Sequence, residues 1–206
     1  MSAGLQSPDS DLSIAEDSAR AGCYALIGRL FYDAPDSDLL AVIRNASPAA
    51  VSSGAPGKFA PAWGALQSVC SNADVDALKR EYDSLFIGVG KAAITLYTSR
   101  FAPDAAADKH LVRLREHLDV LGLARRSAVF EIEDHISGLC DVMRHLIEGN
   151  QALEDQRQFF DIFVKAGAMP LCDAVEHAEL AVFYKQVAAF ALAFFELETQ
   201  AFEMEE

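Results

Sequence analysis

The sequence of 206 residues has no apolar run long enough to cross a membrane. Its longest run, Val187 to Phe195, is bounded by Gln186 and Glu196, whereas a membrane-spanning helix needs about 20 apolar residues. We interpret the run as a buried helix and expect no stable membrane insertion. The stretch from Met1 to Asp11 also lacks a basic start followed by an apolar block, so no secretory signal is predicted.

Paired cysteines are also lacking. Cys23, Cys70, Cys140 and Cys172 are far apart, and no two of them form a Cys-x-x-Cys pair. The spacing therefore predicts neither a zinc site nor a disulfide framework. Scattered thiols of this kind behave as small buried hydrophobes in a reducing compartment, which favours a cytoplasmic protein.

Basic residues are scarce, since 17 Lys and Arg stand against 31 Asp and Glu and the formal net charge is −14. Nucleic acids and anionic membranes carry negative charge and are repelled by such a surface. We therefore expect no nucleic-acid partner, whereas a basic partner would be attracted. The length suffices for one core that needs no metal or disulfide.

Apolar residues recur at helical spacing along most of the chain, and no segment alternates as a strand does. This pattern predicts an all-α fold, a single-domain bundle of about eight helices joined by short turns. A loose tail over residues 1–12 is expected to precede an all-helical domain over residues 13–206. The predicted helices cover about 13–33, 36–45, 61–70, 74–86, 104–121, 131–148, 151–165 and 170–198.

Capping signals mark several of these helix ends. Residues 13–16 (Ser-Ile-Ala-Glu) fit a capping box, and Asp36 or Ser37 and then Asp74 are suited to cap the second and fourth helices. Glycine is expected to end the helices that stop at about 121 and 165. A break near His177 is considered in the last helix.

The sequence does not match the motif of a phosphate-binding loop or that of a serine hydrolase, and whether a nucleotide binds stays open. The run Gly88-Val89-Gly90-Lys91 lacks the first glycine of a phosphate loop, where Leu85 stands, and the following Ser or Thr, where Ala92 stands. No Gly-x-Ser-x-Gly elbow is present either. We predict no catalytic residues and no cofactor.

A metal-binding helical bundle, or an enzyme that uses acid–histidine pairs, is the main alternative. Di-iron bundles carry Glu-x-x-His on two helices, and this sequence has no such motif. Three acid–histidine pairs do lie four residues apart and can share a helix face: Glu131/His135, Asp141/His145 and Asp173/His177. The simpler interpretation is surface carboxylates beside surface histidines, so no metal is predicted.

Two further segments are distinctive. One is 81–88 (Glu-Tyr-Asp-Ser-Leu-Phe-Ile-Gly) with 96–99 (Leu-Tyr-Thr-Ser), and the other is 131–136 (Glu-Ile-Glu-Asp-His-Ile). Judged from the residues alone, core packing explains the apolar side chains of the first. The acids of the second are explained by favourable placement at a helix N-terminus.

Together these segments resemble the signature of the TorD/DmsD/NarJ-like family of redox-enzyme maturation chaperones. That family carries Glu-Tyr-x-x-Leu-Phe-x-Gly, then an aromatic-x-Ser step, and later Glu-Pro-x-Asp-His-Ile. The resemblance spans about residues 13–197, although Ile132 replaces the usual proline and Val89 departs from the usual Gly-Pro. It implies a TorD-like bundle and a cytoplasmic chaperone that binds the twin-arginine leader, the folding catalytic subunit, or both, of a molybdopterin oxidoreductase.

The resemblance also implies a peptide-binding site. Its aromatic and aliphatic members would take the leader's apolar helix, and its carboxylates, with Glu133, would pair the leader's arginines. Family members can exchange helices, so a monomer and a domain-swapped homodimer both remain open, with hinges at 47–57 and 122–128. The implied site residues are Tyr82, Leu85, Phe86, Leu96, Tyr97, Phe101, Glu131, Asp134 and His135.

Overall fold

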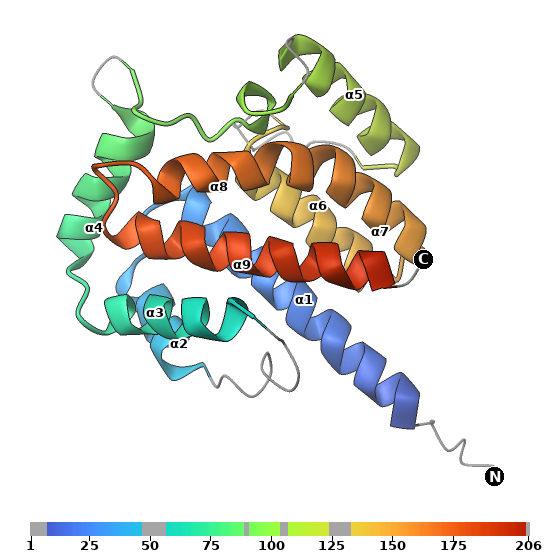
Figure 1. The fold of residues 1–206 in the computed structure, drawn as a ribbon, viewed down its shortest axis with the longest axis horizontal. Helices are drawn as coiled ribbons and strands as arrows, with labels where there is room; N and C mark the ends of the chain where they lie inside the picture. The colour runs from blue at the N-terminus through green and yellow to red at the C-terminus, as the bar shows by residue number, and fades with distance from the viewer. Residues whose placement is uncertain (1–7, 47–56, 89–90, 104–106, 124–132, 205–206) are drawn as a thin grey trace.

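Helices make up most of the computed structural model, which describes residues 8–46, 57–88, 91–103, 107–123 and 133–204 (Figure 1). Within these ranges, the β-type pairing is a single isolated bridge between Tyr97 and His135. The all-α prediction is confirmed. Among the described residues, no helix is long and apolar enough to cross a membrane.

The helices form eight continuous stretches in the described part of the chain, because some of them join end to end. Two stretches contain π-helical segments, Asp83–Ile87 after α4 and Phe160–Ala168 between α7 and α8. A short 3₁₀ turn, Thr98–Arg100, precedes α5. The α-helices are α1 (Pro8–Tyr32), α2 (Ser37–Asn45), α3 (Phe59–Ser71), α4 (Val75–Tyr82), α5 (Ala107–Val120), α6 (Ile136–Glu148), α7 (Leu153–Phe159), α8 (Met169–Glu176) and α9 (Phe183–Met204).

Helix α9 runs through the middle of the bundle, beside α8 and against α3, while α1 packs on α6 behind it (Figure 1). The apolar run from Val187 to Phe195 lies in α9 and is mostly buried, which confirms its interpretation as a core helix. Helix α1 approaches α6 closely at Gly28, where an added Cβ would lie 3.3 Å from the Cβ of Cys140. Larger side chains at that crossing would force the two helices apart.

A buried polar cluster joins α1 to α9. The guanidinium of Arg20 donates to both carboxylate oxygens of Glu198, at 2.8 and 2.9 Å. Tyr24 donates its hydroxyl to the same carboxylate at 3.0 Å. Arg20 also donates to Gln156 of α7 at 3.2 Å and lies over the ring of Phe202. The cluster therefore fixes three helices relative to one another.

All four cysteines are free and buried. Burial raises the pKa of the Cys70 thiol to about 11 and that of the Cys23 thiol to about 12. The pKa values of Cys140 and Cys172 are raised by burial as well. Protonated, buried thiols are poor nucleophiles and poor metal ligands, so these side chains act as core residues, as the sequence predicts.

Several predicted helix boundaries are confirmed by their capping hydrogen bonds. The carboxylate of Asp36 accepts from the backbone N–H of Leu39 at 2.8 Å, and that of Asp74 accepts from Ala77 at 2.9 Å. After α5, Gly122 adopts a φ of +68°, a left-handed conformation that glycine tolerates best.

Several boundaries differ from the prediction, among them the start of α6 at Ile136 rather than at 131–134 and the end of α9 at Met204 rather than at about 198. Helix α1 begins at Pro8 rather than at Ser13, so the capping-box residues lie inside the helix. Gly167 does not end a helix, because the chain runs on from the π-helical segment into α8. A Cβ at Gly167 would lie 3.0 Å from the Cβ of Thr98. The glycine is thus required by the close approach of another segment rather than by a helix end, and the break falls at His177.

Candidate functional site

Glu81, the first residue of the 81–88 segment, caps helix α9. Its carboxylate accepts from the backbone N–H groups of Val182 and Tyr184 at 2.9 Å each and of Phe183 at 3.1 Å. The first N–H groups of a helix have no partner within the helix, and an ionised acceptor there is favoured by the helix dipole as well. This role could not be predicted from the sequence, because no local pattern links Glu81 to a helix start about 100 residues away.

Tyr82 joins the same segment to the end of α1. Its hydroxyl donates to the carbonyl oxygens of Phe31 at 3.1 Å and Tyr32 at 2.9 Å. Its ring lies 5.1 Å from that of Phe86 and 5.7 Å from that of Tyr184, between ring centres. In this conformation the 81–88 segment therefore holds α1, α4 and α9 together.

The structure brings the 96–99 segment against the 133–137 segment, and we call this region the signature junction. The backbone N–H of Thr98 donates to the carbonyl of Asp134 at 2.9 Å, and the N–H of Ile136 donates to the carbonyl of Leu96 at 3.0 Å. The hydroxyl of Thr98 also donates to the carbonyl of Asp134 at 2.9 Å. These bonds form the single β-type bridge of the described residues.

Asp134 does not cap the helix that follows it, although it stands just before the start of that helix. The residue is 3% exposed, and one carboxylate oxygen accepts from the N–H of Ser99 at 3.3 Å. The N-cap of α6 is His135, whose Nδ1 accepts from the N–H of Ser137 at 3.2 Å. The carboxylate turns toward the 3₁₀ turn because the bridge places that turn beside it.

His135 is buried within the junction. Its Nδ1 also lies 2.7 Å from the hydroxyl of Ser137, and its ring meets that of Tyr97 edge to face at 5.7 Å. Tyr97 and Phe101 are half-buried, so part of each ring reaches the surface. Glu133 is half-buried as well and pairs with Arg115 of α5 at 3.1 Å.

The residues implied as a peptide-binding site thus fall into two groups, half-buried and buried. The half-buried pair, Tyr97 and Phe101, is accessible to a partner as the protein stands. Glu131 lies outside the described residues. The others pack in the interior and would contact a peptide only after the junction or the 81–88 segment moved: Tyr82, Leu85, Phe86, Leu96, Asp134 and His135.

We expect the junction residues to affect stability in a graded way. His135→Ala removes the N-cap of α6 and should lower the free energy of unfolding by about 0.5–2 kcal/mol, whereas His135→Asn retains a good capping residue and should cost less. Asp134→Ala leaves the N–H of Ser99 without its acceptor and should cost about 1–3 kcal/mol, with Asp134→Asn again milder. Urea unfolding of the four variants checks this order. If the Ala and Asn variants at one position lost equal stability, capping or hydrogen bonding by that side chain would not be the cause of the loss.

The acid–histidine pairs do not assemble a metal site in the part of the chain that the structure describes, where no three His, Cys, Asp or Glu side chains are grouped suitably. Asp173 and His177 lie 3.5 Å apart on the exposed end of α8. Asp141 pairs instead with Arg144 at 3.4 Å. His135 is engaged by Ser137.

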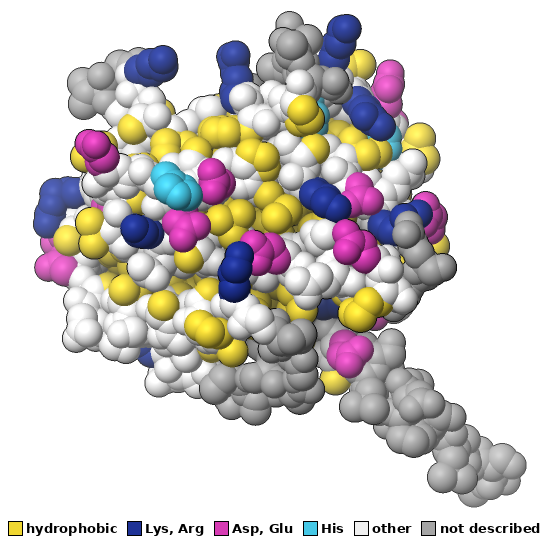
Figure 2. Space-filling view, in the orientation of Figure 1, with side chains coloured by type: hydrophobic (Ala, Val, Ile, Leu, Met, Phe, Trp, Pro, Cys, Tyr) yellow, Lys and Arg dark blue, Asp and Glu magenta, His cyan; other side chains and the backbone are white. Residues whose placement is uncertain are grey.

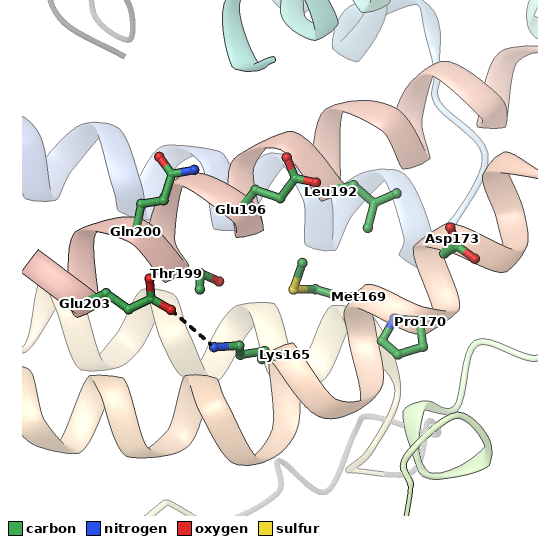
Figure 3. Close-up of a pocket in the computed structure, with 9 residues that line it drawn as sticks. All are labelled: Lys165, Met169, Pro170, Asp173, Leu192, Glu196, Thr199, Gln200 and Glu203. Carbon is green, nitrogen blue, oxygen red and sulfur yellow. Dashed lines mark ion pairs between the residues drawn. The ribbon is translucent and has the colours of Figure 1, made fainter. Parts of the chain in front are cut away.

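An open groove of about 680 Å³ lies between α9 and the stretch formed by α8 and the end of the π-helical segment (Figure 3). Figure 2 shows apolar surface along this line, with acidic side chains on both sides. Met169 and Leu192 face each other across its floor (Figure 3). The other lining residues are Lys165, Pro170, Asp173, Glu196, Thr199, Gln200 and Glu203.

The fold is that of a known class of helical protein. A candidate redox enzyme maturation protein from Archaeoglobus fulgidus superposes with a TM-score of 0.51, covering 96% of this chain and 98% of that chain at 22% identity. Comparison with protein families matches residues 54–168 to the family described as nitrate reductase delta subunit. The chain belongs to that family, which confirms the resemblance to the TorD/DmsD/NarJ-like chaperones. No curated protein matches the chain significantly.

Family membership also fixes the general class of activity. This is a maturation chaperone for a molybdoenzyme, not a catalytic enzyme. The matched residues include the 81–88 segment, the signature junction and the π-helical segment that contacts it. The capping and bridging bonds of these segments therefore belong to the framework of a binding protein.

Proposed function

We propose that this protein acts in the cytoplasm, where it binds the twin-arginine leader, the folding catalytic subunit, or both, of a molybdopterin oxidoreductase. It holds this client until the cofactor has been inserted and export can begin. The observation that carries the proposal is the family match over residues 54–168. A chaperone of this kind acts by binding and needs no cofactor of its own.

The charge of the protein supports a basic client. A twin-arginine leader combines an arginine-rich part with an apolar part. The formal net charge of −14 would steer such a peptide toward the protein, and apolar surface would retain it. At the signature junction, Tyr97, Phe101 and Glu133 are all half-buried, and Tyr97 pairs with His135, two residues after Glu133. We propose these three as the accessible part of the implied peptide site.

Calorimetric titration tests the proposal. Twin-arginine leaders from the same genome should bind more tightly than scrambled leaders of equal composition. Their binding should weaken as the salt concentration rises, because salt screens attraction between exposed charges. A second titration with the catalytic subunit lacking its leader separates the two client types. If neither the leaders nor the subunit binds better than its control, the proposal fails.

The oligomeric state is part of the same proposal. The segments 47–56 and 124–132, which contain most of the two expected hinges, lie outside the described residues. A monomer and a domain-swapped homodimer are both compatible with client binding, and sedimentation velocity distinguishes them.

A further inference from the structure

The α8/α9 groove is not used by any residue of the family signature. Gly167 faces the signature junction through its contact with Thr98, whereas Lys165 and Met169, two positions to either side of it, line the groove. The groove and the junction thus lie on different faces of one continuous helical stretch. A client that offers two segments can therefore meet two separate surfaces.

We propose that this groove is the docking site for an arginine-bearing amphipathic helix. The inference deepens the proposed function and rests on it, since a leader that is helical when bound would bring arginines next to apolar side chains. The groove extends along α9 from Leu192 to Glu203, which at 1.5 Å per residue is about 16 Å, or three helical turns.

The floor of the groove suits the apolar side of a helix. Met169 and Leu192 are only partly buried, although both also pack against the core. The unbranched thioether of methionine adapts to different apolar partners. Helical peptides commonly bind by placing side chains spaced three and four residues apart into such a groove.

The rims of the groove suit arginine. Three acids, Asp173, Glu196 and Glu203, line it together with one base, Lys165. The Nζ of Lys165 lies 3.8 Å from a carboxylate oxygen of Glu203 and 3.8 Å from one of Asp161. Both distances are longer than a hydrogen bond, so this lysine is held weakly across the groove (Figure 3).

The guanidinium of a client arginine can displace that lysine, because it binds a carboxylate more strongly. It forms two parallel hydrogen bonds with a carboxylate, which an ammonium group cannot do. Glu203 would receive one client arginine as Lys165 moves aside. Glu196, which pairs with exposed Lys58 at 3.0 Å, would receive another. A second copy of this acidic chain is a poor occupant by comparison, because it would bring carboxylates against carboxylates.

The test uses a defined probe, a fluorescein-labelled peptide of 16 residues with leucines on one helical face and arginines beside them. Fluorescence anisotropy should show binding to the wild type. The double variant Glu196→Gln/Glu203→Gln should bind about tenfold more weakly, whereas Lys165→Ala should bind a few times more tightly because the competing cation is gone. Asp38 is an exposed acid of α2 that does not line the groove. Asp38→Asn removes one charge there and should change binding by less than twofold.

The results distinguish this inference from the proposed function. No binding of the probe by the wild type, or equal weakening by Asp38→Asn and the double variant, would overturn the groove assignment. The assignment would also be overturned if sedimentation showed that the wild type is a dimer and that the groove variants are monomers. If a natural leader binds the wild type and the double variant equally, the groove assignment fails and the proposed function stands. If no natural client binds, the proposed function fails. Binding of the probe peptide still tests whether the groove accepts an arginine-bearing helix.

Discussion

Glu198→Ala is expected to lower the free energy of unfolding by about 3 kcal/mol, the lower end of the usual cost of breaking a buried ion pair. The carboxylate is nearly inaccessible and receives both Arg20 and Tyr24. Its removal leaves a guanidinium in a low-dielectric site without its main partner. We expect a cost at the lower end of this range because the Arg20 side chain is 20% exposed and retains an ion pair with Asp17 at 3.0 Å. For a chain of this size the melting temperature should fall by about 6–12 °C.

A double-mutant cycle isolates the interaction of Arg20 with Glu198. Arg20→Met/Glu198→Leu removes both charges and replaces them with apolar side chains, so it should be less destabilised than the sum of its single variants. Glu198→Gln keeps hydrogen-bond acceptors for Tyr24 and should fall between wild type and Glu198→Ala. A loss below about 1 kcal/mol for Glu198→Ala would show that the pair does not hold α1 to α9.

Glu81→Ala is expected to cost about 2 kcal/mol, at the upper end of the range for losing a helix N-cap. Three backbone N–H groups at the start of α9 lose their common acceptor. Two of them are partly buried, so water replaces the carboxylate only in part. Glu81→Gln should cost less, because its single carbonyl oxygen still accepts from part of the group. Chemical unfolding monitored by circular dichroism measures each loss.

Glu179→Ala is the matched control for this prediction. Glu179 is an exposed acid in the turn that leads into α9, and its removal should change stability by no more than about 0.5 kcal/mol. If Glu81 acts as a cap, Glu81→Gln should still bind the client once folded. Unchanged unfolding of Glu81→Ala combined with lost client binding would instead indicate direct contact between Glu81 and the client.

Local signals in the sequence predicted the helices well. The helix ends depend on local interactions, within about four residues. Asp36 and Asp74 each cap a helix, and Gly122 forms the turn after α5, as their residue types favour. The apolar run in α9 is buried because it has too few residues to span a membrane and too many apolar ones to face water. The signature segments identified the family, since a motif is a property of the sequence itself.

The site was less predictable, because its residues act at long range. Core packing was the simpler explanation of Tyr82, Leu85 and Phe86 from the residues alone, whereas the family resemblance implied a peptide site. Their burial is decided by helices packed from elsewhere in the chain. Gly167 was predicted to end a helix, but it is a glycine because Thr98 packs closely against it. Among the acids of the α8/α9 groove, Glu196 and Glu203 belong to no motif, and Asp173 was noted only as the partner of His177.

By itself, the sequence determined that this chain is all-helical, acidic and a member of a maturation chaperone family. The tertiary structure decided which side chains hold the bundle together and which of the implied site residues are buried. Glu81 reaches amides more than 100 residues away, and Arg20 reaches a carboxylate 178 residues away. The physical reason is that helical periodicity and capping report interactions within one turn, whereas these contacts exist only after separate helices have packed.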